Sequence, residues 1–377
     1  MSSRTTFIAT IFTFLALACP MAQAQQAAPA AAPAAPAAPR QEGDYIVKDY
    51  KFRTNQTMAE VKLHYTLVGT PIRNAAGKII NGVLVMHGSS NDANQVLAAS
   101  FFDPLFGPGG PLDSKSYYLI FPDAVGAGKS SKPSDGLHAK FPNYGYEDLV
   151  DLEHRLITDG LGIDHLRAVM GISMGGMHTW LWGVRYPDMM DALIPISSLP
   201  SKVEGRNLFW RRLLVNAIKS DPEWKDGDYT SPPRGYLAFI PVFDMMIQSP
   251  VRMNERLDTI EKADAEVQTV MGGHAKADDA NNILFRFSAS YDYNPMPELG
   301  KIKAPLLNVL FADDELNVVD LGITAGAIPN VAKGQRFILP ASPISQGHRT
   351  QVQAAQFKDV IAKFVATWPP MAGAAGR

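Results

Sequence analysis

The chain has 377 residues, a length that suggests one large domain or two smaller ones. Apolar residues make up 46% and charged residues 19%, which provides material for a buried core and excludes bulk disorder. The 35 lysines and arginines nearly balance the 37 aspartates and glutamates, and this balance argues against a nucleic-acid-binding protein. The single cysteine, Cys19, excludes an internal disulfide and a cysteine-based zinc site.

The first 24 residues have the pattern of an export signal. Arg4 precedes an apolar run over residues 7–18, which is shorter than the roughly 20 residues of a transmembrane helix. An A-x-A site at residues 22–24 predicts cleavage before Gln25, and hence a periplasmic or secreted protein with no stable membrane insertion once the signal is removed. A short membrane anchor is the alternative. The Ala/Pro-rich residues 25–43 are expected to form a disordered tether.

From residue 44 onward, strand patterns and helix patterns alternate. The expected strands cover residues 45–52, 60–68, 82–86, 117–121, 168–172, 192–196, 305–311 and 336–339. The expected helices cover residues 146–160, 174–186, 318–328 and 350–364. Such alternation indicates βαβ units in a mainly parallel sheet, with the first two strands antiparallel. Residues 200–297 carry several helical patterns without buried strands, so we expect a helical cap inserted into an α/β core of residues 44–199 and 298–368.

The clearest chemical signal is the sequence Gly171-Ile172-Ser173-Met174-Gly175-Gly176. It fits G-x-S-x-G between a buried strand and a helix, which is the context of a nucleophile elbow. Small residues must flank the serine in so tight a turn, and Gly176 allows the helix to pack closely. The turn presents the Ser173 hydroxyl at the helix N-terminus, where the dipole favours developing negative charge. An ordinary strand-to-helix turn is the alternative.

A serine hydroxyl needs an adjacent base, and this elbow requires the chain order serine, acid, histidine. His348 follows the last expected strand and is the predicted base, whereas His274 is expected in a polar loop of the cap. Three carboxylates follow the strand at residues 305–311, namely Asp313, Asp314 and Glu315. We favour Asp314 over Asp313 as the acid and regard Glu315 as the weakest candidate.

Two backbone N–H groups are expected to form an oxyanion hole. One belongs to Met174, and the other to Ser89 in the loop after the first buried strand, where Gly88 lets the backbone approach closely. His87 is expected to be a buried residue that stabilises this turn. The chemistry needs no cofactor or metal, and no metal-binding spacing occurs in the sequence.

Two other groups of side chains are expected to have structural roles. Asp151, Glu153 and His154 lie on an amphipathic helix pattern and are expected on its solvated face. The apolar cluster of Phe239, Phe243, Met245 and Met246 is expected to form the core of the cap, with an acyl pocket as the alternative.

Between residues 81 and 348 the chain resembles an α/β-hydrolase of the homoserine O-acetyltransferase-like group. The shared stretches are Phe106-Gly107-Pro108-Gly109, Leu161-Gly162-Ile163, the elbow up to Met177, Tyr186-Pro187, Ala217-Ile218, Asp221-Pro222-Glu223-Trp224 and Gly227-Asp228-Tyr229. The resemblance implies the α/β-hydrolase fold, with Ser173, Asp314 and His348 as the catalytic triad.

Two departures from that group bear on the substrate. Val215 stands where the group carries an arginine that binds the substrate carboxylate, although Arg211 and Arg212 are close. An exported enzyme, moreover, does not meet acetyl-CoA. We therefore expect a serine hydrolase that cleaves small or medium carboxylic esters through an acyl-enzyme. The alternatives are an acyltransferase of the resembling group and a non-catalytic binding protein on the same fold.

Overall fold

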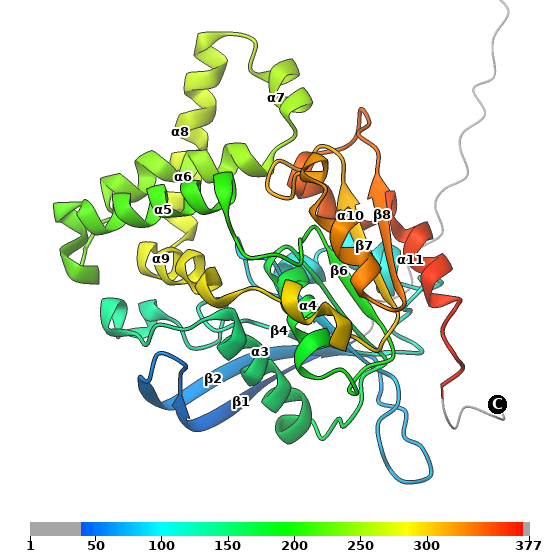
Figure 1. The fold of residues 1–377 in the computed structure, drawn as a ribbon. Helices are drawn as coiled ribbons and strands as arrows, with labels where there is room; N and C mark the ends of the chain where they lie inside the picture. Colours follow the sequence, from blue (N-terminus) through cyan, green and yellow to red (C-terminus); the bar gives the residue numbers. More distant parts are fainter. Residues whose placement is uncertain (1–38, 372–377) are drawn as a thin grey trace, which may run out of the picture. The chain divides into compact units, whose positions relative to one another are not determined.

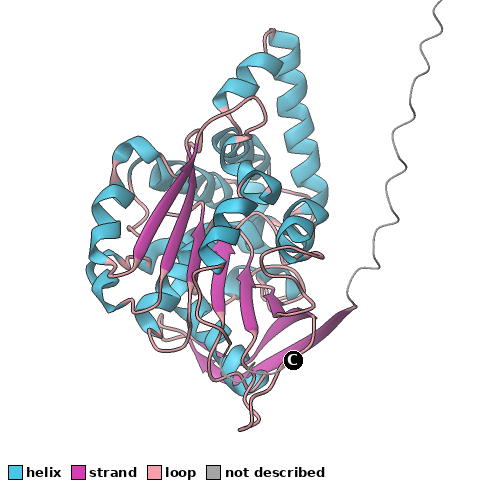
Figure 2. Cartoon of the chain, turned by 90° about the vertical axis from the view of Figure 1, so that its right-hand side faces the viewer, coloured by secondary structure: helices cyan, strands magenta, loops and turns pink. Residues whose placement is uncertain are grey.

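The computed structural model describes residues 39–371, in which eight strands form one sheet (Figures 1 and 2). The strands are β1 Arg40–Lys51, β2 Thr57–Val68, β3 Gly82–Met86, β4 Tyr118–Pro122, β5 Ala168–Ile172, β6 Leu193–Ile196, β7 Leu306–Phe311 and β8 Gly334–Leu339. Their order across the sheet is β1-β2-β4-β3-β5-β6-β7-β8. β2 is antiparallel to both β1 and β4, and the remaining neighbours are parallel. The expected α/β architecture is confirmed.

The first strand begins earlier than the sequence suggested. Residues 40–43, expected in the tether, belong to β1 and pair with β2 from Val68 to Tyr65. These residues are polar and largely exposed because β1 is an edge strand, so their composition resembles that of a linker. The expected signal with Cys19, and the tether up to residue 38, lie outside the described residues.

The central strands separate two hydrophobic layers. Successive side chains of a strand point to opposite faces of the sheet, and β3 shows this clearly. Val83 and Val85 pack in one layer with α2 (Ala99–Phe106) and α11 (Lys358–Val365), while Leu84 and Met86 pack in the other with α3 (Tyr146–Arg155) and α4 (Met174–Arg185). Burial on both faces explains why these strands appear in the sequence as continuous apolar runs.

The helices that cover the sheet differ in part from those expected. They are α1 Asn94–Leu97, α2 Ala99–Phe106, α3 Tyr146–Arg155, α4 Met174–Arg185, α10 Ile323–Ala327 and α11 Lys358–Val365. α1 and α2 were not predicted, because both are short and α2 contains Pro104. The helix expected over residues 318–328 is divided because Gly322 adopts a left-handed conformation with φ of 69°. The helix expected over 350–364 begins only at Lys358, after two 3₁₀ turns, Gly347–Val352 and Ala354–Gln356.

The cap lies between β6 and β7 and consists of helices (Figure 1). These are α5 Gly205–Ser220, α6 Arg234–Ile247, α7 Pro250–Arg256, α8 Ile260–Ala277 and α9 Ala280–Ser288, with a 3₁₀ turn at Ala289–Asp292. Trp210, Phe243 and Phe287 join α5, α6 and α9, with ring centroids 5.0 Å apart in each pair. The segment between β6 and β7 is therefore helical.

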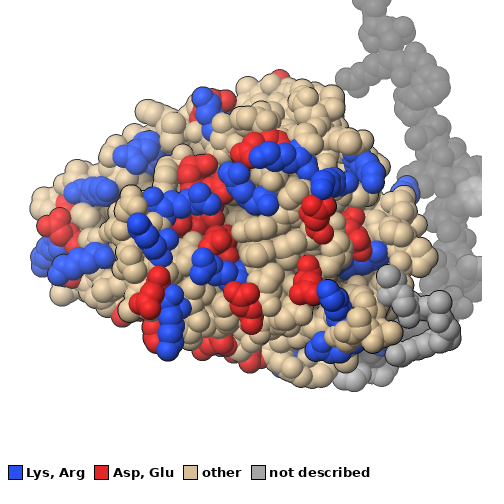
Figure 3. Space-filling model, turned by 60° about the horizontal axis from the view of Figure 1, so that its bottom comes forward, with Lys and Arg blue, Asp and Glu red and all other residues tan. Residues whose placement is uncertain are grey.

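The surface charges of both signs are interspersed on the face drawn in Figure 3. Within residues 39–371 no helix is long and apolar enough to cross a membrane.

Candidate active site

The turn between β5 and α4 holds Ser173 in a strained conformation. Its φ is 52° and its ψ is −114°, values that a non-glycine residue rarely adopts. The flanking glycines are sterically required. A Cβ on Gly171 would meet the Gly175 carbonyl at 2.4 Å, and one on Gly175 would meet the Met86 oxygen at 2.4 Å. The fold thus holds Ser173 half-buried on a tight turn, with its hydroxyl at the start of α4.

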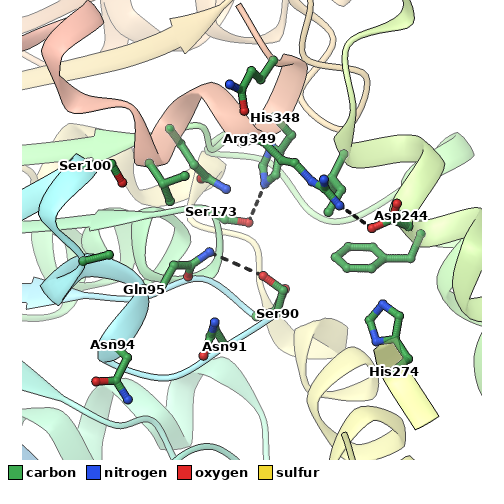
Figure 4. A pocket seen from close by; sticks show the side chains of 17 residues that line it. Ser90, Asn91, Asn94, Gln95, Ser100, Ser173, Asp244, His274, His348 and Arg349 are labelled. Atoms are coloured by element: carbon green, nitrogen blue, oxygen red, sulfur yellow. Dashed lines mark hydrogen bonds and ion pairs between the residues drawn. The ribbon is translucent and has the colours of Figure 1, made fainter. Parts of the chain in front are cut away.

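The fold brings Ser173 and His348 together, although they lie 175 positions apart in the sequence. His348 Nε2 lies 2.9 Å from Ser173 Oγ, and the dashed line in Figure 4 marks this contact. On the other side of the ring, His348 Nδ1 lies 2.7 Å from Asp314 Oδ2. An ionised carboxylate can only accept, so Nδ1–H donates to Asp314 and Nε2 is free to accept the Ser173 proton.

The three candidate acids occupy different positions. Asp314 is fully buried against the His348 ring, whereas Asp313 accepts the Gly347 N–H at 2.9 Å with Oδ2. Glu315 pairs with Arg206 at the surface. Two adjacent residues of a turn cannot direct their carboxylates to the same imidazole, and the chain path after β7 places Asp314 there.

The Asp314 carboxylate accepts hydrogen bonds from residues that the sequence analysis did not assign to it. Oδ1 accepts the N–H groups of Leu316 and Asn317 at 2.8 and 3.0 Å, and Oδ2 accepts the Ser197 hydroxyl at 2.8 Å. Burial raises the pKa of Asp314, but the charge and hydrogen bond of His348 and the hydrogen bonds of Asn317 outweigh burial and hold the pKa below its ordinary value. Ser197 follows β6, and Asp314 follows β7, the neighbouring strand. The order of the strands in the sheet is therefore the signal that could have revealed Ser197.

The two predicted oxyanion donors lie on either side of this serine. Met174 is the first residue of α4, and the N–H at that position has no acceptor within the helix. Ser89 lines the same cavity as Ser173, and a Cβ on Gly88 would come within 3.2 Å of the Ser173 Cβ. The Gly88 N–H is already bonded to Gln95 Oε1 at 2.8 Å. This arrangement leaves Ser89 as the candidate from this loop.

A buried arginine of the cap fixes the Ser89 loop. Arg286, on α9, donates to the Ser89 carbonyl at 2.8 Å and to the Gly126 carbonyl at 2.7 Å. Among residues 39–371 no carboxylate lies within ion-pair distance of it. Arg286 was not predicted as a site residue, although it is the single charge within the apolar run from Ile283 to Phe287, which could have indicated a buried role.

His87 stabilises the same loop through contacts of both its ring nitrogens. The side chain is buried, its Nδ1 lies 2.7 Å from the Gly88 oxygen, and its Nε2 accepts the Ala124 N–H at 3.0 Å. Burial lowers the pKa of His87, which favours the neutral ring that this pair of bonds requires. These contacts are those of a turn-stabilising residue.

Ser173 opens into a cavity of about 470 Å³ between the core and the cap. Figure 4 shows Gln95, Ser90 and Asn91 on one side of Ser173, with Arg349 and Asp244 on the other. The cavity is also lined by Phe243, whereas Met246 is buried elsewhere in the cap. Phe239 and Met245, the other two members of the cluster, are exposed and do not belong to the cap core as expected.

His274 lies in a helix rather than in the expected loop. It is part of α8, and its Nδ1 lies 2.6 Å from Asp278 Oδ2, one turn further along the same helix. Gly272 and Gly273 suggested a loop, but neither is in a left-handed conformation and both continue the helix. His274 lines the cavity at a wall formed by the cap, while His348 makes the contact with Ser173.

The helix face that carries Glu153 is buried, not solvated as expected. Glu153 accepts the Trp182 indole N–H at 3.0 Å and lies 2.8 Å from His178 Nδ1. His154 is half-buried, and its ring stacks on Tyr186 with centroids 3.9 Å apart. α3 packs against α4 here, so polar groups of α4 supply the partners that burial of a carboxylate demands. Helical periodicity alone cannot reveal such partners.

Among the described residues that line this cavity, the only arginine is Arg349, and it already pairs with Asp244, so none stands free in place of the arginine that binds a carboxylate in the resembling group. Val215 is buried in α5. Arg211 lines a separate cavity of about 270 Å³ together with Arg212, away from Ser173. In the described part of the chain, no cluster of three or more metal-binding side chains occurs.

The chain is similar in sequence and in fold to several known enzymes. Residues 105–235 match the family described as the alpha/beta hydrolase fold. A probable acyltransferase from Methanothermobacter thermautotrophicus is 27% identical over 263 residues, which cover 69% of this chain and 79% of that protein. A homoserine O-acetyltransferase from Moorella thermoacetica is 33% identical over 183 residues, 44% of this chain and 48% of that protein. The match thus spans about half the length of that second relative.

A solved structure shows the same fold. The crystal structure of esterase E22 has a TM-score of 0.74 at 19% identity, and the likeness covers 86% of this chain and all of that one. The proteins similar to this chain thus include an esterase and acyltransferases, and the chain is an enzyme with the α/β-hydrolase fold.

Proposed function

Because the chain belongs to the α/β-hydrolase superfamily and is similar to its homoserine O-acetyltransferase-like group, we propose that it cleaves carboxylic esters by acyl transfer through Ser173. The observation that carries the proposal is the continuous chain of contacts from Asp314 through His348 to Ser173, at 2.7 and 2.9 Å. Nucleophile, base and acid stand within hydrogen-bonding distance, at a serine that faces a cavity.

In the proposed first step, His348 Nε2 takes the Ser173 proton while Oγ attacks the ester carbonyl. Asp314 holds the ring in the required tautomer and stabilises the imidazolium. The N–H groups of Ser89 and Met174 stabilise the oxyanion, and each such donor is typically worth about 10²–10³ in rate. His348 then gives its proton to the departing alcohol, which leaves an acyl group on Ser173.

In the second step, His348 takes a proton from water, and the hydroxide oxygen attacks the acyl carbonyl. The carboxylic acid departs and Ser173 regains its proton. The names of the relatives support an alcohol acceptor as the second candidate for this step. The lack of a free arginine in the cavity favours water over homoserine, because a carboxylate in the cavity needs an unpaired cation.

The experiment that tests the proposal supplies an activated acetyl ester with homoserine and measures free acetate and O-acetylhomoserine separately. We expect mostly acetate, and none of it above background in the Ser173→Ala variant. A majority of acetylhomoserine would establish the acyltransferase. A product that does not depend on Ser173, together with failure of a serine-directed phosphonate to label the protein, would favour the binding-protein alternative.

We also propose that the enzyme acts in the periplasm or outside the cell. Support comes from the apolar run of residues 7–18 and the A-x-A site at residues 22–24. N-terminal sequencing of protein recovered from cell fractions tests this. A mature chain that begins at Gln25 in the exported fraction is expected, and an intact chain confined to the cytoplasm would contradict export.

A further inference from the structure

The cavity beside Ser173 is lined mainly by side chains that form hydrogen bonds without carrying charge. Of its seventeen lining residues, nine have hydroxyl or carboxamide groups and four are apolar. The carboxamides are Asn91, Asn94, Gln95, Gln346 and Gln351. Ligand cavities are more often lined by hydrophobic and aromatic side chains with a few polar groups. This cavity is therefore rich in donors and acceptors for a polar ligand.

Gln351 provides a second, independent observation. It is 4% exposed, and its Oε1 has no hydrogen-bond partner in the part of the chain that the structure describes. Buried polar atoms in proteins are nearly always satisfied, and a hydroxyl group is a suitable donor for this oxygen. Gln351 lies on the 3₁₀ turn Gly347–Val352 that also carries His348. The oxygen itself is buried, so the side chain must turn toward the cavity that Gln351 lines before a ligand hydroxyl binds there, next to the proposed base.

The charged side chains that line the cavity already have partners of opposite charge within the protein. Arg349 forms an ion pair with Asp244, whose second oxygen accepts the Gln248 amide at 2.6 Å. The His274 ring lies 2.6 Å from Asp278. Homoserine carries an ammonium and a carboxylate, and each would need a free counter-charge when desolvated here. An uncharged alcohol has no such requirement.

We propose that the alcohol part of the substrate is uncharged and rich in hydroxyl groups, as in an acylated sugar or polyol, and that the acyl part is short. The inference rests on the proposed function. A cavity of about 470 Å³ suits one sugar ring with a short acyl group. Its four apolar lining residues can contact the acyl group, and the remaining volume beside a sugar ring limits the length of that group.

The reaction with such a substrate balances as follows. The Ser173 oxygen forms a bond to the acyl carbon, and the bond from that carbon to the sugar oxygen breaks. His348 transfers the serine proton to the sugar oxygen, so the alcohol leaves as a neutral hydroxyl. Water then supplies the oxygen and the proton that release the acid and restore Ser173.

The first test compares kcat/KM for 6-O-acetylglucose, O-acetylhomoserine and butyl acetate. We expect the sugar ester to exceed the other two by about tenfold or more, because a site built to bind hydroxyl groups discriminates against analogues that lack them. An equal or higher value for either competitor would overturn the inference. Cleavage of p-nitrophenyl acetate, with Ser173→Ala as the blank, separates this failure from failure of the proposed function.

Variants of two glutamines in the same segment provide the matched comparison. Gln351→Met should lower the ratio of kcat/KM for the sugar ester over the nitrophenyl ester by about tenfold, because a buried acceptor is lost. Gln353→Met, at a half-buried position that does not line the cavity, should leave that ratio unchanged. Equal ratios in both variants would contradict the assignment.

Binding tests the cavity without turnover. The Ser173→Ala variant should bind 6-O-acetylglucose saturably in calorimetry, and the added Gln351→Met change should weaken this binding by about tenfold. Absence of binding, or an unchanged affinity in the double variant, would overturn the inference even if the protein hydrolyses simple esters.

Discussion

Two parts of the Ser173 cavity are built differently: the core wall, which carries Ser173, Asp314 and His348, and the mouth. On the core side, Ser173, Asp314 and His348 are fixed by glycines that admit no Cβ, by buried hydrogen bonds and by neighbouring parallel strands. Around the mouth, Ser90, Asn91 and other polar residues are exposed and have few partners. The comparison teaches that the fold fixes the proposed chemistry, whereas the choice of alcohol depends on side chains that little else constrains.

The largest expected effect concerns the core wall. Ser173→Ala removes the proposed nucleophile and should lower turnover of p-nitrophenyl acetate by about 10⁴-fold or more. The folded structure should persist because alanine is small enough for the turn, although it too must adopt a positive φ. Kinetics and circular dichroism on the same preparation check both statements. Residual activity near that of the unchanged enzyme would falsify the assignment.

The next largest effect distinguishes the two adjacent aspartates. Asp314→Asn should lower kcat by about 10³–10⁴-fold, because an asparagine no longer holds the required tautomer of His348. Asp313→Asn keeps an acceptor for the Gly347 N–H and should cost less than about tenfold. Steady-state kinetics of both variants test the pair, and similar losses in the two would be inconsistent with the geometry.

A smaller effect is expected where the cap contacts the core wall. Arg286→Met removes two hydrogen bonds from the Ser89 loop and should lower kcat by about 10–100-fold, with KM changed by less than about threefold. Arg286→Lys should restore part of kcat because a lysine can still reach one carbonyl. A rise in KM with kcat unchanged would show that Arg286 acts on substrate binding instead.

The smallest effect concerns stability where the cap meets α3. Asp292 accepts the Tyr146 N–H at 2.8 Å, and burial raises its pKa to about 6, despite this bond and the Glu147 N–H that lower it. The folded state therefore holds this proton more tightly than the unfolded state. The free energy of unfolding contributed by Asp292 should fall by about 1–3 kcal/mol as the pH rises from 4 to 7.

Denaturant unfolding at several pH values measures this contribution against the Asp292→Asn variant, which cannot titrate at that position. The difference between the two proteins should shift in favour of the variant as the pH rises through 6. Parallel stability curves over this range would contradict the raised pKa.

Most of the fold was predictable from the sequence because it depends on local patterns. Strands buried on both faces appear as short apolar runs, and β3 and β5 were located to the residue. Errors occurred where the pattern was weak. Residues 40–43 are polar because β1 is an edge strand, and Gly322 interrupts a helical pattern through its left-handed conformation. Such features depend on the neighbouring strand and on the backbone angle.

The sequence by itself led to the prediction of Ser173 as nucleophile and His348 as base, because the elbow and the chain order impose strict local requirements. It narrowed the acid to three adjacent carboxylates. Only the tertiary structure decided which carboxylate meets the His348 ring, because that choice depends on the path of the chain after β7. Only the tertiary structure, too, brought Arg286 to Ser89 and Gln351 to the cavity, because these contacts join segments that no local pattern relates.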